Sequence, residues 1–216
     1  MLLSKDIGSE IFILDKLTYA GELDNLKDVI NQVNFIKGDI ADSQHVMALF
    51  EEHRFDIVVN FAAESHVDRS LVDASPFLTS NIIGTAVLLE AVKRFEPELF
   101  CQISTDEVYG SIDDGLFDEF SRMNPSSPYS ASKAAADNLA NAYFTSFGVP
   151  VVITRSSNNY GPHQYPEKLI PYFTTLALQN KNLPLYGDGL NIRDWLYVKD
   201  NCEGIFTVLE KGNKIG

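Results

Sequence analysis

Short apolar runs alternate with longer stretches of helical spacing along this chain, and that alternation most strongly limits the folds open to it. The apolar runs are rich in β-branched and aromatic residues, and they predict strands at 10–15, 34–39, 56–63, 99–105 and 149–157. The stretches between them predict helices at 22–31, 43–53, 76–95 and 128–147. Several runs are apolar almost throughout, which suits burial on both faces of a sheet. The pattern therefore predicts an α/β fold, a doubly wound parallel sheet covered by helices.

The alternation does not extend over the whole chain. Residues 1–157 carry it and are predicted to form one α/β domain, whereas residues 158–216 are rich in Pro, Gly, Tyr and Asn and predict a second, less regular lobe. A chain of 216 residues with 45% apolar and 11% aromatic content can bury a core of that size.

The formal net charge of -13 argues against binding to nucleic acid or to an anionic membrane surface. An anionic ligand must therefore find a local basic site. No apolar run is expected to reach the roughly 20 residues that span a bilayer, and the first residues lack the plan of a signal peptide, so a cytoplasmic location is predicted. Neither cysteine has metal-ligand spacing, so no metal site is predicted; Cys101 and the single tryptophan, Trp195, are predicted to be core residues.

Polar residues follow several predicted strands. Ligands of an open parallel sheet bind outside the carboxyl ends of its strands, where Asp15, Asp39, Thr105, Asp106 and Glu107 are expected. The adjacent carboxylates Asp106 and Glu107 are either placed for chemistry or simply begin the next helix or turn, since acidic residues favour helix N-termini.

Asp15 ends a strand where a dinucleotide-binding unit places an acidic residue on the adenosine ribose. The glycine-rich turn G-x-G-x-x-G of such a unit should lie about 20 residues earlier, which falls before Met1. The first strand, the glycine-rich loop and most of the first helix are therefore expected to be missing. Either the chain is a truncated gene product or a fragment, or Asp15 is only a surface carboxylate.

Tyr129 and Lys133 form a Y-x-x-x-K motif on a helix that Ser127 caps and Pro128 begins. A spacing of four places both side chains on one helix face. A neighbouring ammonium favours the phenolate of tyrosine, so the pair can take a proton from an alcohol while hydride leaves its carbon. The alternative is an ordinary exposed pair.

Six segments together closely resemble the dTDP-glucose 4,6-dehydratases, members of the extended short-chain dehydrogenase/reductase family. They are 15–21, 62–70, 104–110, 129–133, 155–171 and 185–198, and the resemblance runs from about residue 11 to residue 211. Its most discriminating part is the triplet Thr105, Asp106 and Glu107. Related epimerases usually lack the carboxylate pair there, and GDP-mannose dehydratases have Ser in place of Asp106.

The resemblance implies a Rossmann-like fold and an NAD-dependent lyase reaction of deoxysugar biosynthesis, such as a rhamnose pathway. Tyr129, helped by Lys133 and a hydrogen bond from Thr105, would deprotonate the sugar 4-hydroxyl as hydride passes to NAD. Glu107 would then remove the C5 proton while protonated Asp106 donates to the departing 6-hydroxyl. Hydride would return to C6, giving dTDP-4-keto-6-deoxyglucose. Adjacent carboxyls in a half-buried site separate their pKa values in the way this requires.

The resemblance also implies two sets of contacts. Those to NAD would come from Asp15, Lys16, Leu17, Thr18, Asp39, Ile40, Phe61, Ala62, Ala63, Glu64, Ser80, Tyr129, Lys133 and Asn159. Those to the nucleotide sugar would come from Ser65, Thr105, Asn158, Lys168, Leu169, Pro184, Leu185, Tyr186 and Arg193. Ser80 departs mildly from the family, which often has Thr there. Lys168 and Arg193 would supply the local positive site that a diphosphate needs.

Three other functions remain open at this stage. One is a UDP-glucose 4,6-dehydratase, because residues 184–186 suit either thymine or uracil. Another is a 4-epimerase, although the carboxylate pair Asp106 and Glu107 argues against it. The third is a truncated, catalytically silent chain that binds sugar nucleotide or dimerises, because family members also continue beyond residue 216. A homodimer through the helices 76–95 and 128–147 is expected from the family.

Overall fold

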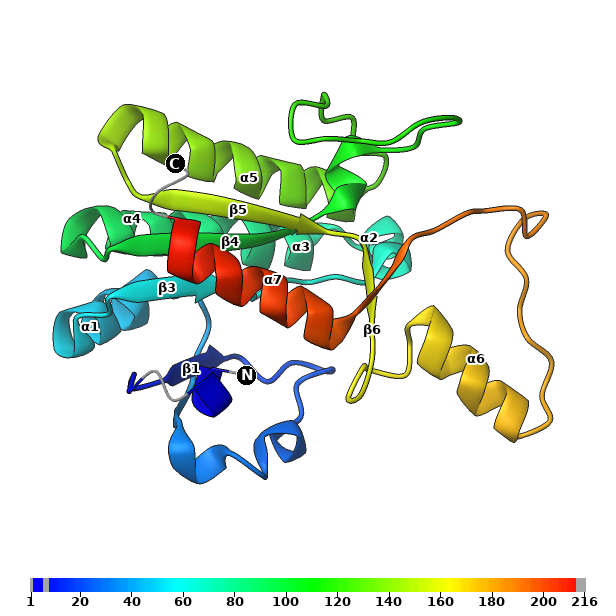
Figure 1. Ribbon diagram of the computed structural model, residues 1–216, viewed down its shortest axis with the longest axis horizontal. Coiled ribbons are helices and arrows are strands. Elements are labelled where there is room, and N and C mark those ends of the chain that lie inside the picture. Colours follow the sequence, from blue (N-terminus) through cyan, green and yellow to red (C-terminus); the bar gives the residue numbers. More distant parts are fainter. Residues whose placement is uncertain (1, 6–7, 213–216) are drawn as a thin grey trace.

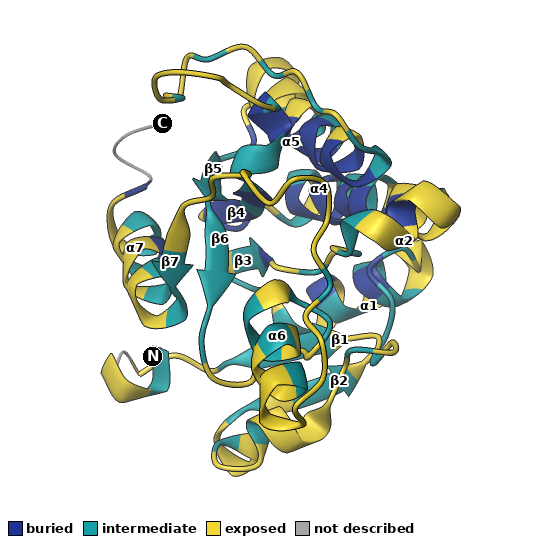
Figure 2. Cartoon of the chain, turned by 90° about the vertical axis from the view of Figure 1, so that its right-hand side faces the viewer, coloured by how far each residue is buried: buried dark blue, intermediate teal, exposed yellow. Residues whose placement is uncertain are grey.

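The centre of the molecule is a three-stranded parallel sheet (Figure 1). The computed structural model describes residues 2–5 and 8–212. Residues 1 and 6–7 of the first predicted domain and residues 213–216 of the second lie outside the described residues. In the sheet, β4 (Leu99–Thr105) pairs with β3 (Ile57–Asn60) on one side and β5 (Val151–Ser156) on the other. Helices α4 (Thr85–Phe95) and α5 (Pro128–Phe147) cover one face, and α7 (Val198–Lys211) lies on the other (Figures 1 and 2).

Two further strand pairs flank this sheet. β1 (Phe12–Asp15) pairs in parallel with β2 (Asn34–Lys37), and β6 (Asn158–Tyr160) pairs in parallel with β7 (Trp195–Tyr197). β1 lies below β3 in both ribbon views, and no strand of the described residues pairs with both of them (Figures 1 and 2). The doubly wound order 3-2-1-4-5-6 is matched by β2-β1 and β3-β4-β5 with its first strand left out between the halves. The prediction of an α/β, Rossmann-like parallel fold without its first strand is confirmed for the described residues.

The hydrophobic core lies between the sheet and the helices α1 (Ser43–His53), α4 and α5 (Figure 2). Phe50, Leu89, Val92 and Phe100 are buried there, and Leu14 of β1 and Val58 of β3 pack against the same cluster. β1 therefore shares one core with the three-stranded sheet although it is not hydrogen-bonded to it.

Helix α5 begins and ends where local sequence signals indicate. The Ser127 hydroxyl accepts a hydrogen bond from the Ser130 backbone N–H, and the Ser130 hydroxyl bonds the Ser127 backbone N–H in return, which forms a capping box. Pro128 occupies the first turn, and Gly148 ends the helix in the left-handed conformation that glycine adopts without strain.

The segment Ser75–Phe95 is a continuous helical stretch that joins α3 (Ser75–Phe77), a π-helical part (Leu78–Gly84) and α4. It is long and apolar enough to cross a membrane by length and composition, so the expectation that no run reaches this length was wrong. Its apolar composition has a cause in the fold, because the stretch buries Phe77 and the inner face of α4 and packs against α1 and α5.

Two expectations from the sequence are corrected here. The predicted helix 22–31 is two short 3-10 turns, Leu23–Leu26 and Ile30–Gln32, because every side chain from 22 to 32 is exposed or half-buried and no buried face supports an α-helix. Trp195 is 40% exposed at the start of β7 and is not a core residue. Cys101 is fully buried, as predicted.

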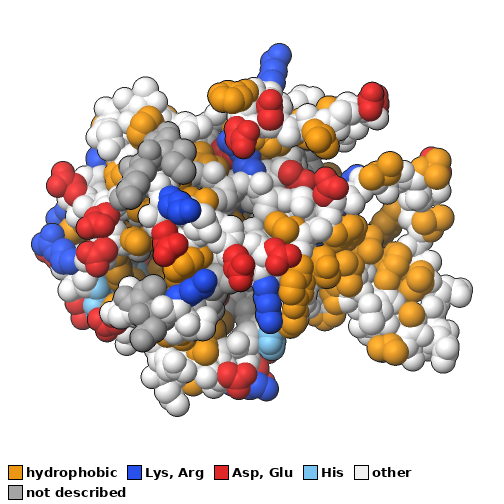
Figure 3. Space-filling view, viewed as in Figure 1, with side chains coloured by type: hydrophobic (Ala, Val, Ile, Leu, Met, Phe, Trp, Pro, Cys, Tyr) orange, Lys and Arg blue, Asp and Glu red, His pale blue; other side chains and the backbone are white. Residues whose placement is uncertain are grey.

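Beyond residue 157 the chain forms β6, α6 (Leu169–Leu178), β7 and α7. Helix α7 returns to pack against β5, whereas none of the side chains of α6 is buried. Exposed apolar side chains gather around α6 and the segment that follows it, among them Leu169, Leu178, Leu185 and Leu190 (Figure 3). The division into domains at residue 157 stays a prediction.

Candidate active site

Strand β4 carries the triplet Thr105, Asp106 and Glu107 to its carboxyl end, where a 3-10 turn (Asp106–Tyr109) begins. The Thr105 hydroxyl oxygen accepts a hydrogen bond from the Glu107 backbone N–H at 3.3 Å, and the Thr105 hydroxyl donates to Asp106 Oδ1 at 3.2 Å. Thr105 is thus the N-cap that fixes the turn, and both carboxyl side chains are half-buried at the edge of the sheet.

Burial raises the pKa of both carboxyls above their ordinary values. The pKa of Glu107 is raised further by the charge of Asp106, while Lys168 and Arg193 act in the opposite direction. For Asp106 the opposing influences are hydrogen bonds, including that from Thr105, and the charge of Arg193. Burial of both carboxyls and the charge of Asp106 on Glu107 favour retention of a proton, which suits an acid and a base side by side.

Tyr129 and Lys133 lie on the face of α5 that packs against β4, and both are buried. Burial, together with the charge of Glu107, raises the pKa of Tyr129, and only the hydrogen bond with Thr105 lowers it. Burial lowers the pKa of Lys133 to about 8, against the influence of Asp137. Lys133 Nζ donates to the Ile103 carbonyl oxygen at 2.6 Å. The expected lowering of the tyrosine pKa by Lys133 is not found here, because burial and nearby carboxylates raise this pKa and the ammonium is bonded to the β4 backbone.

A buried ion pair that the sequence analysis missed lies beneath Lys133. Asp137 is fully buried, and its Oδ2 accepts from Arg155 Nε at 2.8 Å, while Arg155 Nη1 donates to the Tyr109 hydroxyl at 2.8 Å. Asp137 follows Lys133 by four residues, so the helical spacing that joins Tyr129 to Lys133 could have identified it as the next residue on that face.

The predicted cofactor residues lie along the carboxyl edge of the sheet. Asp15 is exposed at the end of β1, where its Oδ1 accepts from the Leu17 backbone N–H at 2.6 Å, and Lys16 Nζ contacts Asp39 Oδ2 at 2.6 Å. Burial raises the pKa of Asp39, but Lys16 and the Ala41 N–H together hold it below its usual value. The Glu64 N–H donates to Asn81 Oδ1 at 2.9 Å. The other predicted cofactor residues range from exposed to buried, namely Thr18, Phe61 and Ala63 exposed, Ala62 and Ser80 half-buried, and Ile40 buried.

The residues present fit the two ribose ends of a dinucleotide. Asp15 offers carboxylate oxygen at an exposed strand end, and Lys133 has ammonium protons beyond the one given to Ile103. The buried Oδ1 of Asn159 has no hydrogen-bond partner among the described residues, so a polar ligand group would satisfy it. Residues 2–5 and 8–212 contain no G-x-G-x-x-G turn to hold the pyrophosphate at a helix N-terminus.

The predicted substrate residues are only partly brought together. Lys168 is half-buried and its Nζ donates to the Ser65 carbonyl oxygen at 2.8 Å, which joins two predicted substrate residues. Asn158 lies in β6 next to Asn159, and Leu169 begins α6. Arg193 is exposed and donates to the Ile192 carbonyl oxygen, and Leu185 and Tyr186 are also largely exposed, while Pro184 is half-buried.

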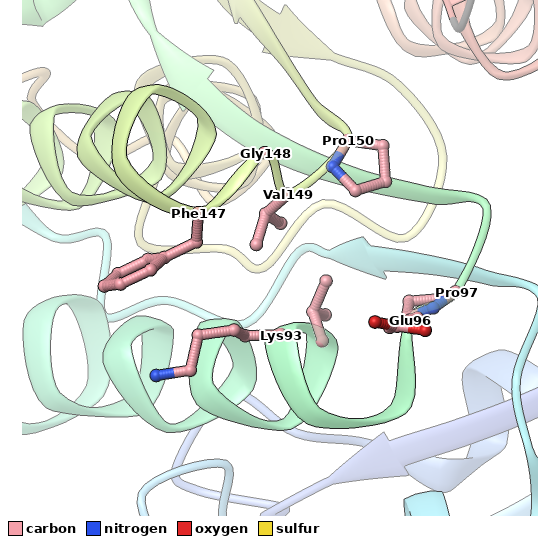
Figure 4. A pocket seen from close by; sticks show the side chains of 8 residues that line it. Lys93, Glu96, Pro97, Phe147, Gly148, Val149 and Pro150 are labelled. Carbon is pink, nitrogen blue, oxygen red and sulfur yellow. The ribbon is translucent and has the colours of Figure 1, made fainter.

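Two cavities formed by the described residues lie at opposite ends of the strands. A cavity of about 210 Å³ lies at the amino ends of β4 and β5, lined by residues such as Lys93, Glu96, Phe147 and Pro150 (Figure 4). It is at the edge opposite to the carboxyl ends of these strands and contains none of the predicted site residues. A larger cavity of about 460 Å³ is lined by Tyr19, Glu64, Arg69 and Phe77, among others, and borders the predicted site.

A parallel sheet with acidic groups at its carboxyl edge and a buried Tyr and Lys pair on the neighbouring helix defines a Rossmann-like protein of the short-chain dehydrogenase/reductase type. Residues 1–215 match the model of the GDP-mannose 4,6-dehydratase family. The chain belongs to this family.

The chain is also similar to individual proteins and solved structures. A dTDP-glucose 4,6-dehydratase of Streptomyces antibioticus is 52% identical, over 94% of this chain and 59% of its own length. The crystal structure of DesIV, a dTDP-glucose 4,6-dehydratase of Streptomyces venezuelae with NAD and TYD bound, matches with a TM-score of 0.93 and 47% identity, over 96% of this chain and 66% of that chain. A UDP-glucose 4-epimerase of Thermotoga maritima, solved with UDP-glucose, matches with a TM-score of 0.89 but only 26% identity, over 97% of this chain and 67% of that chain. The chain thus spans about three fifths to two thirds of the length of these relatives.

Proposed function

We propose that this protein is an NAD-dependent dTDP-glucose 4,6-dehydratase, which removes water across C5 and C6 of the sugar. The observation that carries the proposal is the pair Asp106 and Glu107 at the end of β4, two half-buried carboxyls with raised pKa values beside the buried Tyr129. An elimination needs an acid and a base at once, whereas an epimerisation through oxidation at C4 needs neither of these carboxyls.

Tyr129 is the group that accepts the proton of the sugar 4-hydroxyl. Its raised pKa keeps the phenol neutral in the protein alone, so positive charge must act on it before it can serve as a base. Lys133, with a pKa of about 8, is largely protonated at neutral pH and supplies that charge on the same helix face. A hydrogen bond with the Thr105 hydroxyl, whose proton is otherwise donated to Asp106 Oδ1, also lowers the pKa of Tyr129. NAD, when bound, supplies the hydride acceptor for C4 and the hydride donor for C6.

The elimination is assigned to the carboxyl pair. The 4-ketone acidifies the C5 hydrogen, and Glu107 accepts it as a proton while Asp106 donates its own proton to the departing 6-hydroxyl. Both carboxyls have raised pKa values, and the charge of Asp106 disfavours ionisation of Glu107, so the site favours retention of a proton by the pair more than water does. The charge of Arg193 acts on both carboxyls and that of Lys168 on Glu107, and both cations are proposed to bind the diphosphate.

The remaining assignments follow the family. The proposed cofactor residues are Asp15, Lys16, Leu17, Thr18, Asp39, Ile40, Phe61, Ala62, Ala63, Glu64, Ser80 and Asn159, and the proposed substrate residues include Ser65, Asn158, Leu169, Pro184, Leu185 and Tyr186. The protein is proposed to act in the cytoplasm as a homodimer. Exposed apolar side chains on the helices 75–95 and 128–147, such as Ile83, Phe144 and Phe147, support an interface there.

The test is a reaction of the purified chain with NAD and dTDP-glucose, followed by mass spectrometry of the nucleotide sugar. A product lighter by one water is expected. The matched control is the double variant D106N/E107Q, which should still reduce NAD with the substrate but form no dehydrated product. Water loss in the double variant would overturn the roles given to the two carboxyls.

Parallel reactions with UDP-glucose decide the nucleotide. Faster dehydration of UDP-glucose would replace dTDP-glucose as the substrate, and a product of unchanged mass with inverted C4 would make the protein an epimerase. A chain that binds dTDP in calorimetry but releases no product would support the catalytically silent alternative.

A further inference from the structure

Glu167 joins three segments of the chain that meet beside the candidate active site. The Tyr19 hydroxyl, from the loop after β1, donates to Glu167 Oε1 at 2.9 Å. His66 Nε2 and Arg69 Nε, at the start of α2 (Val67–Val72), lie 3.7 Å and 3.5 Å from Glu167 Oε2. The Glu167 side chain is only 15% exposed, whereas its partners Tyr19 and Arg69 remain partly open to solvent.

The groups around Glu167 also contact one another. The Arg69 guanidinium lies 3.7 Å from the centroid of the Tyr19 ring, and the Tyr165 ring packs edge-on against Tyr19 at 5.7 Å. Burial and the bond to Glu167 raise the pKa of Tyr19 to about 12, so its hydroxyl stays protonated and remains a donor at physiological pH. Tyr19 is therefore held from both ends, at the hydroxyl by Glu167 and over the ring by Arg69.

The next residue along the chain, Lys168, contacts the same loop. Its Nζ donates to the carbonyl oxygen of Ser65, the residue before His66. Burial lowers the pKa of Lys168, while the charges of Glu167 and Glu107 act against this. Glu167 and Lys168 together thus fasten the chain before α6 to residues 65–69 by three contacts, one of them the ion pair of Glu167 with Arg69.

Tyr19 also belongs to the segment proposed to bind the cofactor. It follows Thr18 directly and stands four residues after Asp15, and the Gly21 N–H bonds the Thr18 carbonyl oxygen at 2.9 Å to close the turn. Tyr19 thus links the loop 15–21 to Glu167, and Glu167 directly precedes Lys168 in the chain.

We propose that Glu167 is a positioning residue that couples the cofactor loop 15–21 to Lys168, so that occupation of the cofactor site tightens binding of the nucleotide diphosphate. The coupling rests on the proposed function, because it assumes that the loop 15–21 holds NAD and that Lys168 binds the diphosphate. Linkage requires it to be reciprocal, so the diphosphate must tighten NAD by the same factor.

The experiment compares E167A, E167Q and Y19F with the unaltered chain. Hydrogen exchange without ligand is expected to quicken in residues 15–21 and 64–70 of E167A, and not in β4 or α5. Calorimetry with dTDP, with and without saturating NAD, measures the coupling, for which allosteric pairs typically show roughly 5- to 150-fold. In E167A the ratio of dTDP affinities with and without NAD is expected to fall close to 1. In Y19F and E167Q part of this coupling is expected to remain. E203A, which removes an exposed carboxylate on α7, is the matched control and should change neither readout.

The outcomes separate this inference from the proposed function. Unchanged exchange in 15–21 of E167A, or an undiminished coupling factor, would overturn the role of Glu167. If the unaltered chain binds neither NAD nor dTDP, the proposed function fails for this chain, and the exchange of residues 15–21 alone then decides whether Glu167 holds the loop. A uniform loss of dTDP affinity with the coupling intact would show Glu167 to be a binding residue only, which also contradicts the proposal.

Discussion

At the scale of single residues, burial changes the proton affinity of the groups in the candidate active site in the direction that favours their neutral forms. It raises the pKa of Asp106, Glu107 and Tyr129 and lowers that of Lys133. The folded state therefore holds each ionised group less readily than the unfolded chain does, and at neutral pH the charges of Asp106, Glu107 and Lys133 are held at a cost in stability.

The carboxyl pair gives the first prediction. A carboxyl whose folded-state pKa is raised contributes stability that is fully present below its unfolded pKa and is lost as pH rises through the folded value. D106N/E107Q does not ionise, so it is expected to be more stable than the unaltered chain at pH 7 by on the order of 1 kcal/mol, with the difference vanishing toward pH 4. Urea unfolding between pH 4 and 8 measures this. A difference that does not depend on pH would contradict it.

Lys133 gives the opposite pH dependence. Its pKa falls from 10.5 to about 8 in the folded protein, so between these values the unfolded chain binds more protons and stability rises with pH. K133M keeps the length of the side chain without the charge. Relative to K133M, the unaltered chain is expected to gain stability from pH 8 to 9.5, by at most about 2 kcal/mol at 1.4 kcal/mol per tenfold change in proton affinity. Parallel unfolding curves of the two proteins across this range would refute the shift.

At the scale of secondary structure, α5 shows where sequence patterns are sufficient to predict a helix and its bounds. Its predicted bounds, 128–147, are those of the structure, because the Ser127 cap, Pro128 and the left-handed Gly148 coincide with a buried face. The prediction of a helix at 22–31 was wrong, because it rested on the spacing of apolar residues alone and none of these side chains is buried. The prediction that Trp195 is a core residue was also wrong, because Trp195 lies at the exposed start of β7.

The site was predictable to the extent that it lies at strand ends. The parallel register of β3, β4 and β5 sets which residues share the carboxyl edge, so Thr105, Asp106 and Glu107 followed from the pattern. Contacts between segments far apart in sequence, such as Arg155 with Asp137 and Glu167 with Tyr19, depend on how helices and loops pack, and nothing in the local sequence indicates them.

The capping box of α5 gives a prediction at this scale. S127A removes the hydroxyl that accepts from the Ser130 N–H, and loss of such a cap costs about 1 kcal/mol of stability. Because the cap lies next to Tyr129, faster hydrogen exchange is expected in the first turn of α5 and not in its last turn. Urea unfolding and exchange measure the two effects. S121A, at an exposed loop bond to Asp118, is the control and should change stability by less than about 0.5 kcal/mol. Equal losses in both variants would contradict a specific cap effect.

At the scale of the whole molecule, the strand order accounts for why β1, β2 and β3 are less buried than β4. The strands β1 and β3 each pair on one side only among the described residues, and both are mostly half-buried, whereas β4, paired on both sides, is mostly buried. Both halves nevertheless contact one hydrophobic core. An unpaired strand edge presents free N–H and C=O groups that can bind another strand.

The last prediction follows from these two edges, which flank the place of the first strand in the doubly wound order. A peptide with an apolar strand, a G-x-G-x-x-G turn and a helix is expected to bind between β1 and β3 as a parallel strand. Binding only the folded chain, it should stabilise it by about 2.7 kcal/mol at 100 times its dissociation constant, and it should slow amide exchange in Phe12–Asp15 and Ile57–Asn60. The same peptide with Pro in the middle of its strand cannot complete the hydrogen bonds and serves as the control. Equal protection by both peptides, or protection at β6 and β7 instead, would show that the edges of β1 and β3 do not accept a strand.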